Sequence, residues 1–220
     1  MQIIWSGQSF FQIVVNQGKD SPVVLAIDPY WETIGLQPPK FAADVVLFSH
    51  DHPDHNNLKL FGQADKKPFI ISAPGEYEVK NIFIQGIPAF HDNALGKDRG
   101  PNTIYVIDAE ELRLCHLGDL GQAELFPEQR EDIGEVDVLM IPVGGVYTVD
   151  GGQAAKIVNQ LEPKLVIPMH YALPKLKYKL EGPEKFLKAL GQKAPESLTK
   201  LIVKKKDLDN EKTKAIILKP

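Results

Sequence analysis

Short apolar runs separated by turn-forming residues predict that the first half of the chain is built mainly of β-strands. In the N-terminal quarter the runs are short and bounded by turns such as Ser6-Gly7. They lie at residues 2–5, 10–15 and 23–27. The unbroken apolar run 45–48 is typical of a strand buried on both faces.

The pattern in the second half changes from strands alone to strands alternating with helices. Three more strands are predicted first, at 82–90, 103–107 and 113–117. They are followed by a strand at 136–141, a helix at 151–161 after the capping residue Asp150, a strand at 165–170 and a helix at 183–190. The apolar runs 201–203 and 215–218, on either side of the charged segment Lys204 to Glu211, predict a hairpin with a solvated turn.

Length, composition and charge limit the classes of protein that the chain can represent. With 220 residues, 43% of them apolar and 25% charged, we expect one globular domain over 1–220. A net charge of −4 disfavours nucleic-acid binding, which normally needs a dense basic face. No apolar run reaches the length of a membrane span, so we expect a cytoplasmic protein. The single cysteine, Cys115, stands in an apolar run and is predicted to be a buried hydrophobe.

A cluster of histidine and aspartate follows the strand predicted at 45–48. Three of the six histidines fall in the segment His50-x-His52-x-Asp54-His55. Residues two apart on a loop leaving a strand can turn the same way, so His50 and His52 can bind one ion. Asp54 and His55 would then face a second ion. The segment therefore predicts a site for two divalent ions.

Three further candidate ligands follow strands predicted elsewhere in the chain: His91, Asp119 and His170. A lone histidine of this kind is more often a hydrogen-bonded core or surface residue, but the tight cluster reverses that preference. Seven protein ligands shared by two ions leave a position open for water, as a catalytic site requires. The sequence therefore favours a catalytic centre with two ions.

Taken in order, these seven residues resemble the signature of the metallo-β-lactamase superfamily. The similarity runs from Asp28-Pro29 to Tyr171, and it is greatest to the compact prokaryotic branch that includes L-ascorbate-6-phosphate lactonase-like proteins. The resemblance implies an α/β fold, a four-layer αββα sandwich. It also implies one ion on His50, His52 and His91, another on Asp54, His55 and His170, and Asp119 bridging the two.

Several residues near this signature have two readings. Many relatives carry Gly-His where this chain has Gly7-Gln8, which leaves a role for Gln8 open. Asp28 either fixes a ligand histidine through its second ring nitrogen or forms an Asp-Pro turn. His116 is a packed residue or a proton donor in the cleft. Loop residues that could orient a substrate are Arg99, Asn102, Thr103, Tyr147 and Tyr171.

The function expected from the resemblance is hydrolysis of an ester, lactone or phosphoester by activated water, with Asp54 and Asp119 as catalytic residues. Zinc suits the mixed ligand set, and manganese or iron stays open. The expected partner is a small molecule, neutral or anionic, and a homo-oligomer stays open.

Three other functions compete with this one. A phosphodiesterase or nuclease could use the same centre, although the acidic balance disfavours it. A non-catalytic metal-dependent binding protein would need the same ligands. A di-iron redox enzyme is disfavoured because its relatives usually carry a glutamate where this chain has His52.

Overall fold

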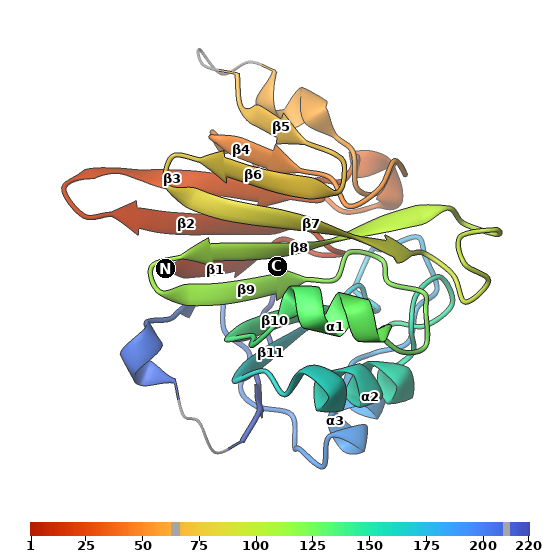
Figure 1. The fold of residues 1–220 in the computed structure, drawn as a ribbon. Helices are drawn as coiled ribbons and strands as arrows, with labels where there is room; N and C mark the ends of the chain where they lie inside the picture. The colour runs from red at the N-terminus through yellow and green to blue at the C-terminus, as the bar shows by residue number, and fades with distance from the viewer. Residues whose placement is uncertain (63–66, 209–211) are drawn as a thin grey trace.

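The computed structural model describes residues 1–62, 67–208 and 212–220, which form two mixed β-sheets (Figure 1). The first sheet has the order β12 (Leu201–Ile202), β1 (Gln2–Trp5), β2 (Phe11–Gln17), β3 (Asp20–Ile27), β4 (Val45–Leu47) and β5 (Phe69–Ile71). The second has the order β13 (Lys214–Ala215), β11 (Leu165–Met169), β10 (Val138–Pro142), β9 (Leu112–His116), β8 (Pro101–Ala109), β7 (Ile82–Phe90) and β6 (Gly75–Val79).

Because several strands run in the same direction, the loops that follow them lie at the same edge of each sheet. In the first sheet β3, β4 and β5 are mutually parallel. In the second sheet β9, β10, β11 and β13 are parallel, and β7 runs the same way because it is antiparallel to β8, which is antiparallel to β9. The residues that follow β7, β9 and β11 therefore meet at one edge.

The two sheets are held together by one apolar core. Alternate residues of β2, namely Phe11, Ile13 and Val15, are buried, as the pleat of a half-covered strand requires. They belong to the same buried cluster as Ile84 on β7 and Val106 on β8. Burial of this apolar surface is the main force that fixes one sheet against the other.

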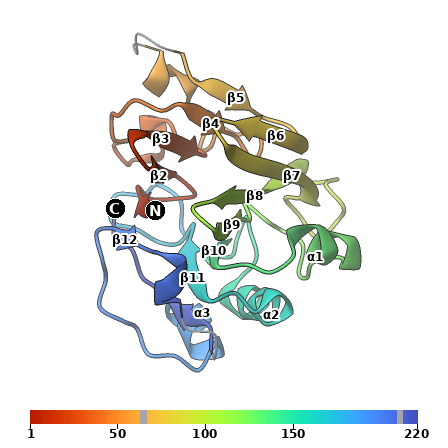
Figure 2. The same cartoon turned by 60° about the vertical axis from the view of Figure 1, so that its left-hand side comes forward.

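The outer faces of the two sheets are covered differently. Three helices lie against the second sheet: α1 (Pro127–Ile133), α2 (Gly151–Leu161) and α3 (Glu184–Ala189) (Figure 2). On the first sheet a smaller apolar cluster is covered by two short 3-10 helices, η1 (Glu32–Ile34) and η2 (Leu58–Phe61). The fold is thus the predicted layered α/β sandwich, with one outer layer reduced to 3-10 turns.

Most predicted elements are present, and the helix predicted at 151–161 has the bounds of α2. The predicted C-terminal hairpin is wrong. β12 pairs with β1 in the first sheet, whereas β13 pairs with β11 in the second. The predicted turn begins with η3 (Lys205–Asp207). Its end, residues 209–211, lies outside the described residues. Two apolar runs in sequence do not specify which strand each will pair with, because the partner is chosen by tertiary contacts.

β5, β6 and α1 were not predicted, because each is short and only partly buried. Cys115 is fully buried, as expected. Within the described ranges, no helix combines the length and apolar character that crossing a bilayer demands.

Replacing Asp150 with alanine should destabilise the protein by about 0.5–2 kcal/mol. Its side chain accepts hydrogen bonds from the backbone N–H groups of Gly152 (2.8 Å) and Gln153 (3.0 Å), and the Gln153 side chain bonds back to the Asp150 N–H. Urea unfolding measures the change. Asp150→Asn retains a capping oxygen and should lose much less; equal losses in the two variants would show that the cap is not what Asp150 contributes.

Candidate metal centre

The candidate ligands lie on loops that leave strand ends at the edge described above. His91 directly follows β7 and His170 directly follows β11, while Asp119 lies three residues beyond β9. His50 lies three residues beyond β4 of the first sheet. Gln8, Asp28 and His170 all have positive φ angles, which non-glycine residues adopt rarely and mostly where surrounding contacts enforce them.

Two groups of side chains are gathered there. The ligand atoms of His50, His52 and His91 all lie within 4.8 Å of one another. So do those of the second group, which consists of Asp54, His55, Asp119 and His170. The structure therefore brings together all seven residues singled out in the sequence, in the two sets that the resemblance implied.

Asp119 connects the two groups. Its Oδ2 atom lies 3.1 Å from His55 Nε2, 3.2 Å from His170 Nε2 and 3.5 Å from His91 Nε2. The first two histidines belong to the second group and His91 to the first. One carboxylate oxygen thus faces histidines of both groups, as a bridging ligand would.

Two hydrogen bonds fix Asp119, one to its side chain and one from its backbone. Ser9 Oγ donates a hydrogen bond to Asp119 Oδ1 (2.9 Å), and the Asp119 backbone N–H donates to Asn102 Oδ1 (3.0 Å). The preceding Gly118 has a φ of +57°, and a Cβ there would lie 2.3 Å from Asn102 Oδ1. A glycine is therefore required where the chain turns into Asp119. The role of Ser9 was missed, since an isolated serine carries no signal in the sequence.

Asp28 orients two of the histidines. Its Oδ2 atom lies 3.1 Å from His55 Nδ1 and accepts a hydrogen bond from Ser49 Oγ (2.6 Å). Ser49 Oγ also lies 2.9 Å from His50 Nδ1. Because the hydroxyl hydrogen points to Asp28, the oxygen can accept from His50 Nδ1–H, which leaves the His50 Nε2 lone pair for another partner.

His50 Nε2 is buried and has no hydrogen-bond partner among the residues that the structure describes. Burial and the neighbouring His55 lower the pKa of His50 to about 3, so its ring is neutral at physiological pH. A buried, neutral imidazole nitrogen without a partner is uncommon in folded proteins. It is the form of histidine that binds a metal ion.

The second group holds buried carboxylates close to histidines. Burial raises the pKa of the Asp119 carboxyl, but His170 and His55 lower it by more, and it lies well below its ordinary value. Burial lowers the pKa of His55, but the surrounding carboxylates, Asp119 first, raise it by more, and it lies well above its ordinary value. Without an ion, protonated His55 balances these carboxylates. A divalent cation can supply that positive charge instead.

Gln8 lies beside the second group. Its Nε2 is 3.2 Å from His170 Nε2, and its backbone carbonyl accepts the His170 N–H (3.0 Å). Its Oε1 atom is buried and lacks a hydrogen-bond partner within the described part of the chain. The residue that stands where many relatives carry histidine therefore contacts a candidate ligand.

The residues suggested for substrate binding fall into three sets. His116 and Tyr171 are buried and bonded to the backbone, His116 Nε2 to Ser9 O (3.0 Å) and the Tyr171 hydroxyl to Leu218 O (3.3 Å), so they are packed residues. The Arg99 guanidinium lies over the Tyr147 ring, 4.8 Å from its centre. Asn102 and Thr103 line a pocket.

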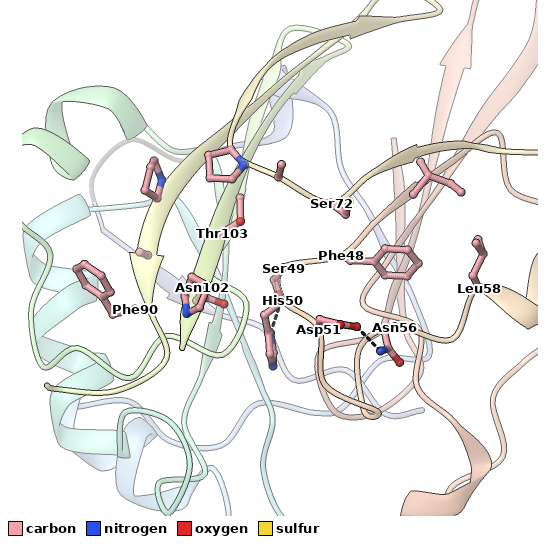
Figure 3. Close-up of a pocket in the computed structure, with 16 residues that line it drawn as sticks. Phe48, Ser49, His50, Asp51, Asn56, Leu58, Ser72, Phe90, Asn102 and Thr103 are labelled. Atoms are coloured by element: carbon pink, nitrogen blue, oxygen red, sulfur yellow. Dashed lines mark hydrogen bonds between the residues drawn. The ribbon is translucent and has the colours of Figure 1, made fainter. Parts of the chain in front are cut away.

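That pocket has a volume of about 640 Å³ and lies between the ends of the two sheets (Figure 3). His50 and Ser49 form part of its wall, so the pocket adjoins the first ligand group. Phe48, Phe90 and Leu58 are among its apolar lining residues. A volume of this size is in the range of sites for small molecules.

Comparison with known proteins agrees with this geometry. A family model described as the beta-lactamase superfamily domain matches residues 2–170, about three quarters of the chain. The chain belongs to the metallo-β-lactamase superfamily. The candidate His and Asp ligands come from four separate loops, those after β4, β7, β9 and β11, and they converge at one edge of the sandwich.

Two relatives and one further structure show how far the similarity extends. A protein of Thermococcus onnurineus named UPF0173 metal-dependent hydrolase is 27% identical over 219 residues, covering 88% of this chain and 94% of that protein. A structure from Thermotoga maritima, named as a candidate zinc-dependent hydrolase of the metallo-β-lactamase superfamily, has a TM-score of 0.77 and 33% identity and covers 99% of both chains. The metallo hydrolase Igni18 of Ignicoccus hospitalis, with a TM-score of 0.60 and 24% identity over 85% of this chain and 88% of that one, shares the fold.

Replacing Asp28 with alanine should weaken zinc binding by about 10- to 100-fold, because His50 and His55 lose the contacts that orient them. Competition with a chromophoric chelator measures this affinity. Asp137→Ala is the matched control, since Asp137 is also a buried carboxylate that accepts a backbone N–H, that of Arg113 (2.9 Å), away from both ligand groups. An Asp28→Ala variant that binds zinc as tightly as the control would refute the orienting role.

Proposed function

We propose that this chain is a metal-dependent hydrolase with two divalent ions, one on His50, His52 and His91 and the other on Asp54, His55 and His170. Asp119 would contribute to both. The observation that carries the proposal is the position of Asp119 Oδ2, within 3.5 Å of histidine nitrogens from both groups. The names of the relatives in Thermococcus onnurineus and Thermotoga maritima point to the same class of activity.

The side chains present fit divalent metal ions. Neutral imidazole nitrogens and carboxylate oxygens are the ligands that zinc binds in catalytic sites, and the same set admits manganese or iron. The unpartnered Nε2 of His50 and the buried carboxylate of Asp119 both have chemistry that a cation would satisfy. Such ions lower the pKa of water and polarise the bond that is attacked.

Asp54 is the residue of this chain best suited to act on the attacking water. Its side chain keeps 15% of its surface exposed, whereas Asp119 keeps 2%. Burial raises the pKa of Asp54, but His55, whose Nε2 lies 3.6 Å from Oδ2, lowers it by more, so the carboxylate is ionised. An ionised, accessible carboxylate can hold a water molecule in place by accepting a hydrogen bond from it.

Hydrolysis of a small molecule is favoured over cleavage of nucleic acid. The chain has a net charge of −4, and no lysine or arginine occurs among the described residues that line the pocket. A phosphodiester backbone is normally held by such cations. A metal-binding protein without turnover would share the ligands but would fail the activity test below.

Elemental analysis of protein purified and reconstituted with zinc should find about two equivalents of metal per chain. His50→Ala should retain about one, because it removes a ligand from the first group only. Asp51→Ala is the matched control, since Asp51 lies in the same loop, is exposed and belongs to neither group. A wild type that binds no metal after reconstitution would refute the proposal.

Asp54→Ala should reduce hydrolysis of p-nitrophenyl acetate by about 10²- to 10⁴-fold, since it removes the carboxylate proposed to orient the attacking water. The zinc-loaded enzyme is assayed, and its metal content is measured in the same sample so that loss of an ion is not mistaken for loss of the orienting group. Asp132→Ala, which removes an exposed carboxylate on α1, should hydrolyse the ester like the wild type. Unchanged turnover in Asp54→Ala would exclude this role for Asp54.

A further inference from the structure

We infer that the pocket beside His50 binds an uncharged, apolar arm of the substrate, so that the enzyme prefers molecules that carry such an arm beside the bond that is hydrolysed. The inference rests on the proposed hydrolase function and specifies its substrate class. It is carried by the composition of the pocket wall and by its position next to one ligand group.

The wall is mostly apolar. Ile70 belongs to β5 of the first sheet, and Ala89 and Pro101 belong to β7 and β8 of the second. Phe48 and Phe90 line the pocket from these two sides (Figure 3). Two large apolar residues at the pocket remain partly in solvent, Leu58 with 38% and Ile70 with 44% of their surface exposed. An apolar ligand that covers exposed apolar side chains in a concave site removes their surface from water, which favours binding.

An anionic group on that arm would find no cationic side chain in the wall. Lysine and arginine are absent from the described lining residues, and Asp51 is their only carboxylate, which would repel an anion and already accepts a hydrogen bond from Asn56 (2.6 Å). Asn102 is also engaged, because its Nδ2 donates to Leu117 O and its Oδ1 accepts from Asp119 N–H. Placing an anion in the pocket itself would therefore carry a desolvation cost that the wall does not offset.

The position of the pocket connects it to the proposed chemistry. His50 is shared by the pocket wall and the first ligand group. An apolar arm in the pocket would therefore leave the remainder of the same molecule next to the candidate metal centre. Hydroxyl groups of Ser49 and Thr103 in the wall can bond to a neutral carbonyl or ether oxygen.

The first test compares p-nitrophenyl acetate, butyrate, hexanoate and octanoate, using the zinc-loaded wild type. kcat/KM should rise about two- to fourfold per methylene until the pocket is filled, the upper figure corresponding to about 0.8 kcal/mol per CH₂. A flat series would overturn the inference.

Variants then locate the effect. Ile70→Ser should flatten the chain-length series while leaving the metal content unchanged. Ile202→Ser is the matched control, because Ile202 is an exposed isoleucine (62%) on β12, at the opposite edge of the same sheet. Equal flattening in both variants would place the apolar site elsewhere.

A binding measurement separates failure of this inference from failure of the proposed function. Titration of zinc-loaded protein with 2-octanone should produce saturable shifts of the Asn102 and Thr103 amide signals in NMR spectra, and 2-butanone, with a shorter apolar arm, should bind more weakly. If 2-octanone binds in this way but no ester is hydrolysed, the proposed hydrolase function is refuted and the apolar site is retained. Acetate hydrolysis with no effect of 2-octanone would retain the hydrolase and refute the apolar site.

Discussion

The arrangement of the centre depends on one buried carboxylate, that of Asp119. Its Oδ2 atom faces histidines that follow β4 and its loop, β7 and β11, elements that belong to both sheets. These side chains can meet only if the two sheets are packed in one register. The apolar core between the sheets therefore does more than stabilise the fold, since it sets the distances within the site.

A buried carboxylate of this kind has to be compensated. Ser9 and the Asn102-bound backbone hold Asp119 in place, and Asp28 holds His55 directly and His50 through Ser49. Buried polar groups contribute to order only when each has a partner. Among the described residues His50 Nε2 is buried without a partner, and the His50 ring lies 4.6 Å from the rings of both His52 and His91. This unpartnered nitrogen is the feature that most clearly favours a bound cation.

The surroundings of the centre are asymmetric. Beside His50 the wall is apolar and carries no basic residue within the described lining, whereas Arg99 lies over Tyr147, whose ring packs 5.8 Å from that of Tyr178. Burial and the nearby Asp54 raise the pKa of Tyr178, so this aromatic pair stands near the second group. In the proposed hydrolase the ligand groups would activate water, and these two unlike flanks would select the molecules that reach them.

The sequence alone determined the strands that lead to the site, helix α2 with its Asp150 cap, and all seven candidate ligands. These features depend on residues close together in the sequence, as periodicity, a capping residue and a dense cluster such as His50 to His55 do. Tertiary structure decided the rest. The separation of β12 from β13, the contact of Gln8 with His170, the support from Ser9 and the pocket between the sheet ends all join residues far apart in the chain. Such contacts are selected by the packing of the whole core, which no local pattern encodes.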